Sequence, residues 1–183
     1  MKLIETALAG VFLAETTTAS DHRGALSRLF CERELAPVLG DRHIVQINQT
    51  LTRSVGTVRG MHWQYSPNAE MKFVRCLKGR VWDVAVDLRT GSSTFLNWHA
   101  EELSAANARM MVLPEGFAHG FQVLESDSEL LYLHTAAYAR ESEGGLSCSD
   151  ERLGIRWPLP VRDLSVRDAQ HPTLGSDFCG VKA

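Results

Sequence analysis

The chain has 183 residues, a formal net charge of −3 and a composition that is 44% hydrophobic and 22% charged. This length supports one well-buried core, and this composition is typical of a soluble globular protein. The weak negative charge excludes broad binding to nucleic acid, which requires a basic face, and no apolar run approaches the ~20 residues that span a membrane.

The N-terminal region, residues 1–40, predicts strand and helix segments. Residues 29–39 predict a helix, with Pro37 near its end and Gly40 as the residue that terminates it. Residues 44–48 then predict a strand. We expect residues 1–183 to form a single domain, with an irregular tail over 175–183.

The segments 72–77 and 80–88 predict two strands separated by Lys78-Gly79, the pattern of a β-hairpin. The second strand has two different faces because side chains alternate along a strand. Val81, Asp83, Ala85 and Asp87 share one face, and the other face is lined by Trp82, Val84, Val86 and Leu88.

Further short strands are predicted at 110–113, 120–124 and 130–135. Many short strands at this spacing indicate an all-β sandwich or barrel with a few short helices. The sequence contains no GxGxxG or Walker loop, so the pattern disfavours a nicotinamide dehydrogenase and a nucleoside triphosphatase.

The four cysteines, Cys31, Cys76, Cys148 and Cys179, are scattered and form no CxxC pair. This pattern favours reduced structural thiols over a disulfide framework or a zinc site. At the N-terminus Glu5 interrupts any apolar signal segment. We therefore expect a cytoplasmic protein.

Two histidine-containing segments, 56–64 and 114–121, resemble the two motifs of the cupin superfamily, which implies a jelly-roll β-barrel. Metal-binding cupins carry His-x-His, a glutamate a few residues later, and a third histidine in the second motif. Here His62 and His119 match, but Gln64 replaces the second histidine and Glu70 lies too far along the chain. An amide is a poor substitute for imidazole as a transition-metal ligand, so we predict no metal.

Several basic groups accompany His62. Arg59 lies three residues before it, and Lys72 lies on the following predicted strand. Burying a guanidinium and an ammonium beside an imidazole is costly without an anionic partner. This grouping predicts an anionic ligand such as a diphosphate.

Ordered motifs over residues 13–174 resemble the dTDP-4-dehydrorhamnose 3,5-epimerase family. The motifs are Asp21-His22-Arg23-Gly24, Arg59-Gly60-Met61-His62, Lys72-Phe73-Val74-Arg75, residues 83–89, residues 114–121, residues 154–158 and Ser165-Val166-Arg167-Asp168. The resemblance implies an isomerase that epimerises a nucleotide-linked 4-keto-6-deoxy hexose at C3, C5 or both, and it implies a homodimer.

The resemblance also implies a role for individual residues. His62 is the base, Asp168 orients it, Tyr132 is the acid on the opposite face of the sugar, and Lys72 lies near the C4 oxygen. Contacts to the nucleotide and sugar are implied for Arg23, Gln46, Asn48, Arg59, His119, Tyr138, Glu143 and Arg167. No redox cofactor is required, because the substrate already carries the ketone that acidifies its neighbouring protons.

One segment departs from the family pattern. After Arg23-Gly24 the family carries aromatic residues and then a glutamate, whereas this chain has Leu26 and Arg28 in that region. The departure leaves the nucleotide base open. Four alternatives also stay open: a 3-epimerase, a 3,4-ketoisomerase, a metal-dependent cupin oxygenase and a non-catalytic sugar-binding cupin.

Overall fold

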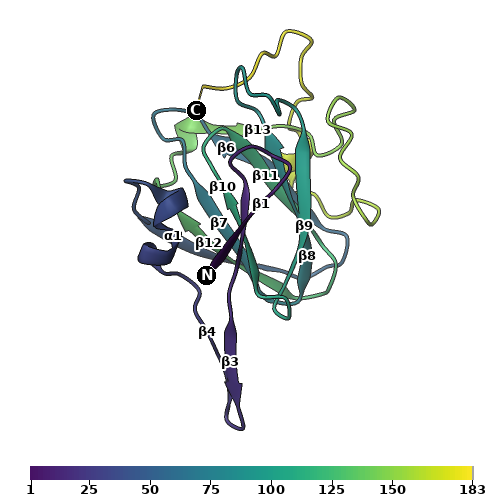
Figure 1. Cartoon of the computed structure of the whole chain (residues 1–183). Coiled ribbons are helices and arrows are strands. Elements are labelled where there is room, and N and C mark those ends of the chain that lie inside the picture. The colour runs from purple at the N-terminus through teal and green to yellow at the C-terminus, as the bar shows by residue number, and fades with distance from the viewer. Residues whose placement is uncertain (183) are drawn as a thin grey trace.

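The computed structural model describes residues 1–182, and two antiparallel sheets dominate it (Figure 1). One sheet has the order β1 (Lys2–Glu5), β2 (Phe12–Glu15), β10 (Arg109–Leu113), β7 (Lys72–Lys78), β12 (Ser128–His134), β5 (Gln46–Thr52). The other has the order β13 (Glu143–Gly145), β6 (Val58–Gln64), β11 (Phe117–Val123), β8 (Arg80–Asp87), β9 (Trp98–Ser104). The predicted all-β sandwich is confirmed.

Strand β8 is buried on both of its faces, and its side chains divide between the two faces as the sequence alternation predicts. Val81 and Ala85 pack into the core between the sheets, together with residues of β7, β10 and β11. Val84 and Val86 pack on the opposite side against residues of the C-terminal segment 146–181. This segment therefore covers the outer face of the second sheet, and it contains the short helix α2 (Val166–Ala169).

The strands on either side of Lys78-Gly79 do not form the predicted hairpin. Strand β7 pairs with β10 and β12, whereas β8 pairs with β9 and β11, so the chain crosses from one sheet to the other at this point. Gly79 has a φ of 74°, and a Cβ there would lie 2.3 Å from the Ser128 Oγ. Gly79 and Arg80 therefore both lie against Ser128, whose hydroxyl oxygen accepts a hydrogen bond from Arg80 N–H.

Several predicted boundaries are wrong. The strands predicted at 120–124 and 130–135 are β11 (Phe117–Val123) and β12 (Ser128–His134). The helix α1 spans Glu32–Leu39 rather than 29–39, because residues 28–31 form the link between the strand that ends at Ser27 and the helix. The strand predicted at 44–48 is β5, Gln46–Thr52, because this stretch pairs with β12 along its whole length, from Gln46↔His134 to Thr52↔Ser128. Pairing with β12 decides the bounds of β5.

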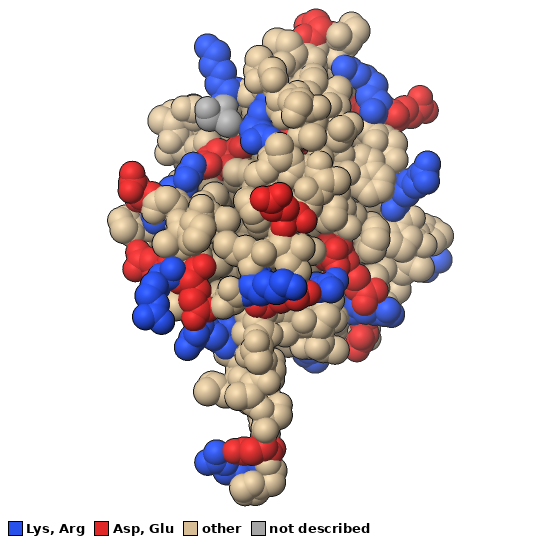
Figure 2. Space-filling view, in the orientation of Figure 1, with Lys and Arg blue, Asp and Glu red and all other residues tan. Residues whose placement is uncertain are grey.

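A hairpin projects from the body of the molecule. It consists of β3 (Thr18–Asp21) and β4 (Gly24–Ser27), and we call residues 18–27 the arm. Figures 1 and 2 show it extending well beyond the sandwich, with charged side chains at its tip. Asp21 and Arg23 form an ion pair there, and Leu26 is 77% exposed.

The remaining regular structure is a 3₁₀ turn, η1 (Arg140–Ser142), just before β13. Over residues 175–182 the structure has no helix or strand, only a bridge between Val181 and Arg89. Within residues 1–182 no helix is both long and apolar enough to cross a membrane.

Candidate active site

A cavity of about 510 Å³ opens between the two sheets and is capped by α2. It collects polar side chains that are far apart in the sequence. Its walls are formed by Asn48, Thr50, Arg59, His62, Trp63, Gln64, Glu70, Lys72, His119, Phe121, Tyr132, His134, Tyr138, Glu143, Ser165, Arg167 and Asp168. The structure thus brings together every predicted site residue except Arg23 and Gln46.

A bulge in β6 aims two of these side chains into the cavity. Arg59 is opposite Phe121 and His62 is opposite His119, so β6 has one extra residue between the two pairs. Without this residue the two side chains, three positions apart, would point to opposite faces of the strand. Gly60 lies in the bulge with a φ of 130°, and a Cβ there would lie 2.5 Å from the Gly120 Cα. Only glycine fits this approach of β6 to β11.

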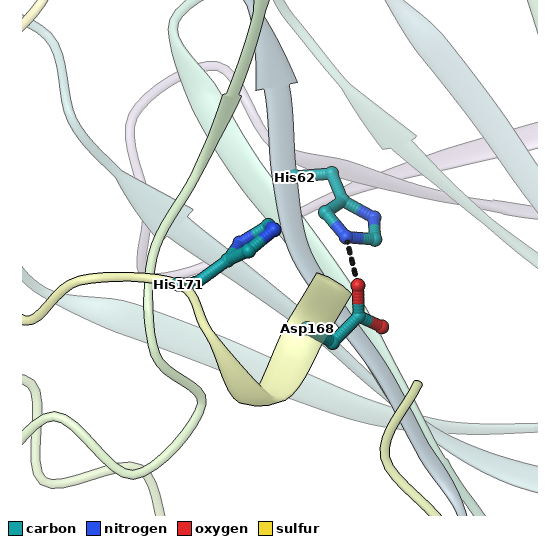
Figure 3. A group of neighbouring side chains, drawn as sticks. All are labelled: His62, Asp168 and His171. Carbon is teal, nitrogen blue, oxygen red and sulfur yellow. Dashed lines mark hydrogen bonds and ion pairs between the residues drawn. The ribbon is translucent and has the colours of Figure 1, made fainter. Parts of the chain in front are cut away.

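His62 and Asp168 form a hydrogen-bonded pair at one wall (Figure 3). The distance from His62 Nε2 to Asp168 Oδ1 is 2.8 Å, and the second carboxylate oxygen accepts from Gly60 N–H at 3.3 Å. Ser165 caps α2 by accepting from Asp168 N–H at 3.0 Å, which fixes the carboxylate in place. Because an ionised carboxylate only accepts, Nε2 carries the proton and Nδ1 keeps a free lone pair.

Electrostatics keep this carboxylate ionised. Burial alone raises the pKa of Asp168, but the hydrogen bond and charge of His62, with the Gly60 amide, outweigh burial and hold the pKa at about 2. An anionic Asp168 stabilises the imidazolium that forms when His62 takes up a proton. The pair therefore has the features of an oriented general base.

Tyr132 comes from the other sheet. It lies on β12, whereas His62 lies on β6, and both line the same cavity. Its ring makes an edge contact with His119, with centroids 5.9 Å apart. Burial is the main cause that raises the pKa of Tyr132 far above its ordinary value, and the negative charge of Asp83 adds to it. The phenol therefore keeps its proton.

A second histidine is oriented by a carboxylate. His119 Nε2 lies 2.8 Å from Asp83 Oδ1, and both side chains are buried. The sequence analysis placed Asp83 on one face of a strand, and the structure shows that this carboxylate pairs with His119. The aspartate orients His119 toward the cavity beside Tyr132.

Lys72 extends into the cavity from β7. Its Nζ lies 3.1 Å from Glu70 Oε1 and donates to the backbone oxygen of His62 at 3.4 Å. Glu70 also pairs with His134 Nδ1, at 2.7 Å. The ammonium thus lies between the two sheets, within reach of a ligand that contacts His62 and Tyr132.

The mouth of the cavity carries exposed charged groups. Arg167 pairs with Glu143 at 2.9 Å, and the Tyr138 hydroxyl donates to the same glutamate at 3.2 Å. Arg59 donates from Nε to Thr52 Oγ1 at 3.0 Å and leaves its other nitrogens free of protein partners among residues 1–182. These guanidinium groups are suited to the phosphates of a nucleotide.

Two predicted residues lie elsewhere in the monomer. Arg23 is at the tip of the arm, paired with Asp21, and does not line the cavity. Gln46 lies behind the mouth, where its side-chain oxygen accepts from Tyr138 N–H at 3.0 Å. Gln46 therefore supports the Tyr138 segment rather than forming part of the wall.

The sequence patterns do not indicate the place of His171 beside His62. Its ring packs edge-on against that of His62, with centroids 5.3 Å apart (Figure 3). Gly145, opposite His62 in β13, makes room for it, because a Cβ there would lie 1.8 Å from His171 Cε1. His171 lies two residues beyond the end of α2, so its contact with His62 depends on tertiary packing and no local sequence pattern indicates it.

His62, Asp168 and His171 are the residues whose ligand atoms approach a metal-binding arrangement, lying within 4.8 Å of one another. However, the Arg167 guanidinium is 3.4 Å from His62 Nε2 and 3.5 Å from Asp168 Oδ1. A positive charge at that point opposes a cation between the same two atoms. The group does not suit a metal, and the absence of a metal stays a prediction.

Comparisons with known proteins agree on one family. The model of the dTDP-4-dehydrorhamnose 3,5-epimerase family matches residues 5–176. The epimerase of that name from Sinorhizobium fredii (strain NBRC 101917 / NGR234) is 40% identical over 168 residues, which cover 91% of this chain and 86% of that protein.

Solved structures of the same kind superpose closely. The dTDP-4-dehydrorhamnose 3,5-epimerase of Elizabethkingia anophelis NUHP1 has a TM-score of 0.90 and 38% identity, covering 97% of this chain and 98% of that one. The dTDP-6-deoxy-D-glucose-3,5-epimerase of Legionella pneumophila Philadelphia 1, in complex with dTDP-4-keto-L-rhamnose, has a TM-score of 0.91 and 34% identity. The superposition covers 100% of this chain and 98% of that one.

Proposed function

The chain belongs to the dTDP-4-dehydrorhamnose 3,5-epimerase family, and from this premise we propose that it epimerises a dTDP-linked 4-keto-6-deoxy hexose at C3, C5 or both. It is an isomerase. The observation that carries the proposal is the placement of His62 and Tyr132 on opposite sheets, across one cavity that Lys72 also enters.

The chemistry follows from the ketone. Protons at C3 and C5 flank the C4 carbonyl, so their removal gives an enolate whose charge rests largely on the C4 oxygen. His62 Nδ1 takes the proton, while the Lys72 ammonium stabilises the developing oxyanion. Tyr132 then returns a proton to the same carbon from the other wall, which inverts the centre. The raised pKa of Tyr132 keeps its proton in place until a strongly basic carbon accepts it.

The nucleotide occupies the mouth of the cavity in this proposal. Arg59 and Arg167 supply positive charge there, and paired guanidinium donors suit a diphosphate. A relative of known structure, the Legionella pneumophila epimerase, is in complex with dTDP-4-keto-L-rhamnose, which supports a dTDP-sugar as the ligand. Asn48, His119 and Tyr138 complete the contacts that we assign to sugar and nucleotide.

We assign the active unit to a homodimer. The residues of both arm strands are exposed, apart from the half-buried Ser27, and the arm projects away from the sandwich (Figure 1), which supports its packing against a second copy. The edge strand β5 exposes Ile47 (61%) and Leu51 (43%), and an unpaired apolar edge requires cover. A second copy also explains Arg23, because the tip of the arm reaches beyond its own cavity.

The cytoplasm is the compartment that we propose for this activity. All four cysteines are free thiols in the structure, which is the state that a reducing compartment maintains.

The direct test is conversion of dTDP-4-keto-6-deoxy-D-glucose, followed by proton NMR. We expect the couplings of the sugar ring to change to those of an inverted C3, C5 or both, with the ketone still at C4. His62→Ala is expected to lower turnover by ~10²–10⁴-fold. His99→Ala is the matched control, because His99 is a half-buried histidine on β9 outside the cavity. Unchanged substrate, or a product with its ketone at C3, would contradict the proposed reaction.

A further inference from the structure

A third histidine–carboxylate pair, Glu70 with His134, lies in the cavity and has no part in the chemistry above. Glu70 lies two residues before the start of β7, and His134 ends β12. In the sheet His134 is the direct cross-strand partner of Lys72, and Glu70 is two residues before Lys72. The carboxylate joins the other two side chains, with Oε2 2.7 Å from His134 Nδ1 and Oε1 3.1 Å from Lys72 Nζ.

All three side chains are strongly buried. The exposed fractions are 7% for Glu70, 11% for His134 and 12% for Lys72. Burial opposes ionisation of Glu70, but the hydrogen bond from His134 and the charge of Lys72 outweigh it, and the pKa of Glu70 lies below its ordinary value. A buried carboxylate in contact with a buried ammonium forms a pair in which removal of either charge leaves the other uncompensated.

His134 is itself fixed at both ring nitrogens. Nδ1 donates to Glu70, and Nε2 lies 3.4 Å from the Asn48 side-chain amide, which offers it a hydrogen. The ring also stacks on Tyr132, with an interplanar angle of 12° and centroids 6.0 Å apart. The position of the Glu70 carboxylate is therefore set by groups on β5 and β12, both in the sheet that carries Tyr132.

Lys72 has few other partners that could hold it. Its side chain has four rotatable bonds, and within residues 1–182 its remaining polar contact is the His62 backbone oxygen at 3.4 Å. A flexible ammonium stabilises an oxyanion only if it stays where the charge develops. The contact with Glu70 restricts Nζ to the space between the His62 wall and the Tyr132 wall.

We propose that Glu70, held by His134, is a positioning residue that fixes the Lys72 ammonium at the place where the substrate's C4 oxygen becomes negative. This inference rests on the proposed epimerase function. It assigns Glu70 and His134 to the reaction although neither carries a proton to or from the sugar.

Glu70→Gln is the principal test, because it keeps the shape of the side chain and removes its charge. We expect kcat to fall by about ten- to a hundredfold, with KM changed far less, since misplacing a catalytic group by ~1 Å has effects of this size. Glu129→Gln is the matched control. Glu129 pairs with Lys78 across the same two strands but outside the cavity, so its loss is expected to leave kcat unchanged.

A double-mutant cycle separates positioning from general destabilisation. In a Lys72→Met background, Glu70→Gln is expected to cause no further loss beyond about twofold, because the group that it positions is absent. A repeat of the full loss in that background, or a Glu70→Gln enzyme with the kcat of the wild type, would overturn the inference.

A structural readout keeps the inference testable without turnover. Crystal structures of the wild type and Glu70→Gln are expected to differ in the position of Lys72 Nζ by about 1 Å or more. An unmoved Nζ would overturn the positioning role. If the wild type itself fails to epimerise, the proposed function is wrong, and the two crystal structures still decide whether Glu70 positions Lys72.

Discussion

Replacing Asp168 by Asn tests the base assignment with the smallest change in shape. The carboxylate accepts two hydrogens, one from His62 Nε2 at 2.8 Å and one from Gly60 N–H at 3.3 Å. An amide has one accepting atom and one donating atom. The amide nitrogen would then face the N–H of either His62 or Gly60, so that two donors oppose each other. The alternative is that the His62 proton moves from Nε2 to Nδ1, which is the other tautomer.

The size of the effect follows from the electrostatics. The pKa of Asp168 falls from 3.8 to about 2, and at ~1.4 kcal/mol for each pKa unit the difference is worth at most ~2.5 kcal/mol. Screening by water at the cavity mouth reduces this to ~1–2 kcal/mol. The folded-state pKa is the lower one, so this contribution is fully present above about pH 4 and is lost as the pH falls through 2.

The same interaction stabilises the His62 imidazolium during proton abstraction. Loss of ~1–2 kcal/mol lowers the rate about five- to thirtyfold, and the tautomer conflict lowers it further, to roughly a hundredfold in total. Steady-state turnover of dTDP-4-keto-6-deoxy-D-glucose at pH 7.5 measures kcat, and a thermal melt shows whether the variant is folded. A folded Asp168→Asn enzyme whose kcat falls by less than about fivefold would show that Asp168 neither orients His62 nor stabilises its imidazolium.

Three further predictions concern stability, metal and assembly. Asp87→Asn removes a buried carboxylate, with a pKa of about 2, that accepts from Arg89, Ser92 and Thr94. Its unfolding free energy is expected to fall by ~1–3 kcal/mol at pH 7. The deficit should narrow as the pH falls from about 4 to 2, and a full deficit at pH 2 would contradict the assignment. Dialysis against a strong chelator is expected to leave turnover unchanged; loss that returns with added metal would favour a metal-dependent cupin. Light scattering is expected to give twice the chain mass of 20.3 kDa, and a fully active monomer would contradict the homodimer.

Local patterns predicted the strands well but not their partners. The alternation of Val81 and Ala85 with Val84 and Val86 predicts which residues share each face of β8, because the period of a strand is intrinsic to its backbone. Lys78-Gly79 predicts a turn. The same residues suit a turn between two paired strands and a turn at which the chain crosses from one sheet to the other. The pairing of β7 with β10 and β12, and of β8 with β9 and β11, decides between the two, and these partners lie from 12 to 62 residues away along the chain.

The candidate site divides in the same way. The motif residues His62, Lys72 and His119 were predicted from ordered sequence patterns, and all of them line the cavity. The pairs His119–Asp83 and His134–Glu70 depend on cross-strand register, which becomes visible only when the sheets are formed. In the sequence Glu70 lies too far along the chain for the glutamate ligand of a metal-binding cupin. In the structure its carboxylate contacts Lys72 instead.

Arg23 shows a limit that a single chain imposes. The motif that contains it resembles the family pattern, yet the arm carries it away from its own cavity. In the homodimer that we propose, the tip of the arm lies against the second copy of the chain. Its role therefore stays a prediction that is linked to the homodimer.

The central claim is that His62 and Tyr132 act on opposite faces of one sugar, and Tyr132→Phe in D₂O tests it most directly. This change keeps the ring that packs against His119 and His134 and removes the proton donor. NMR then follows deuterium incorporation at C3 and C5 separately from the formation of inverted product. We predict that deuterium still enters the substrate, because His62 returns an exchanged proton to the face it came from, while inverted product forms slowly. Equal loss of exchange and inversion, or loss of neither, would contradict the assignment of Tyr132 as the opposite-face acid.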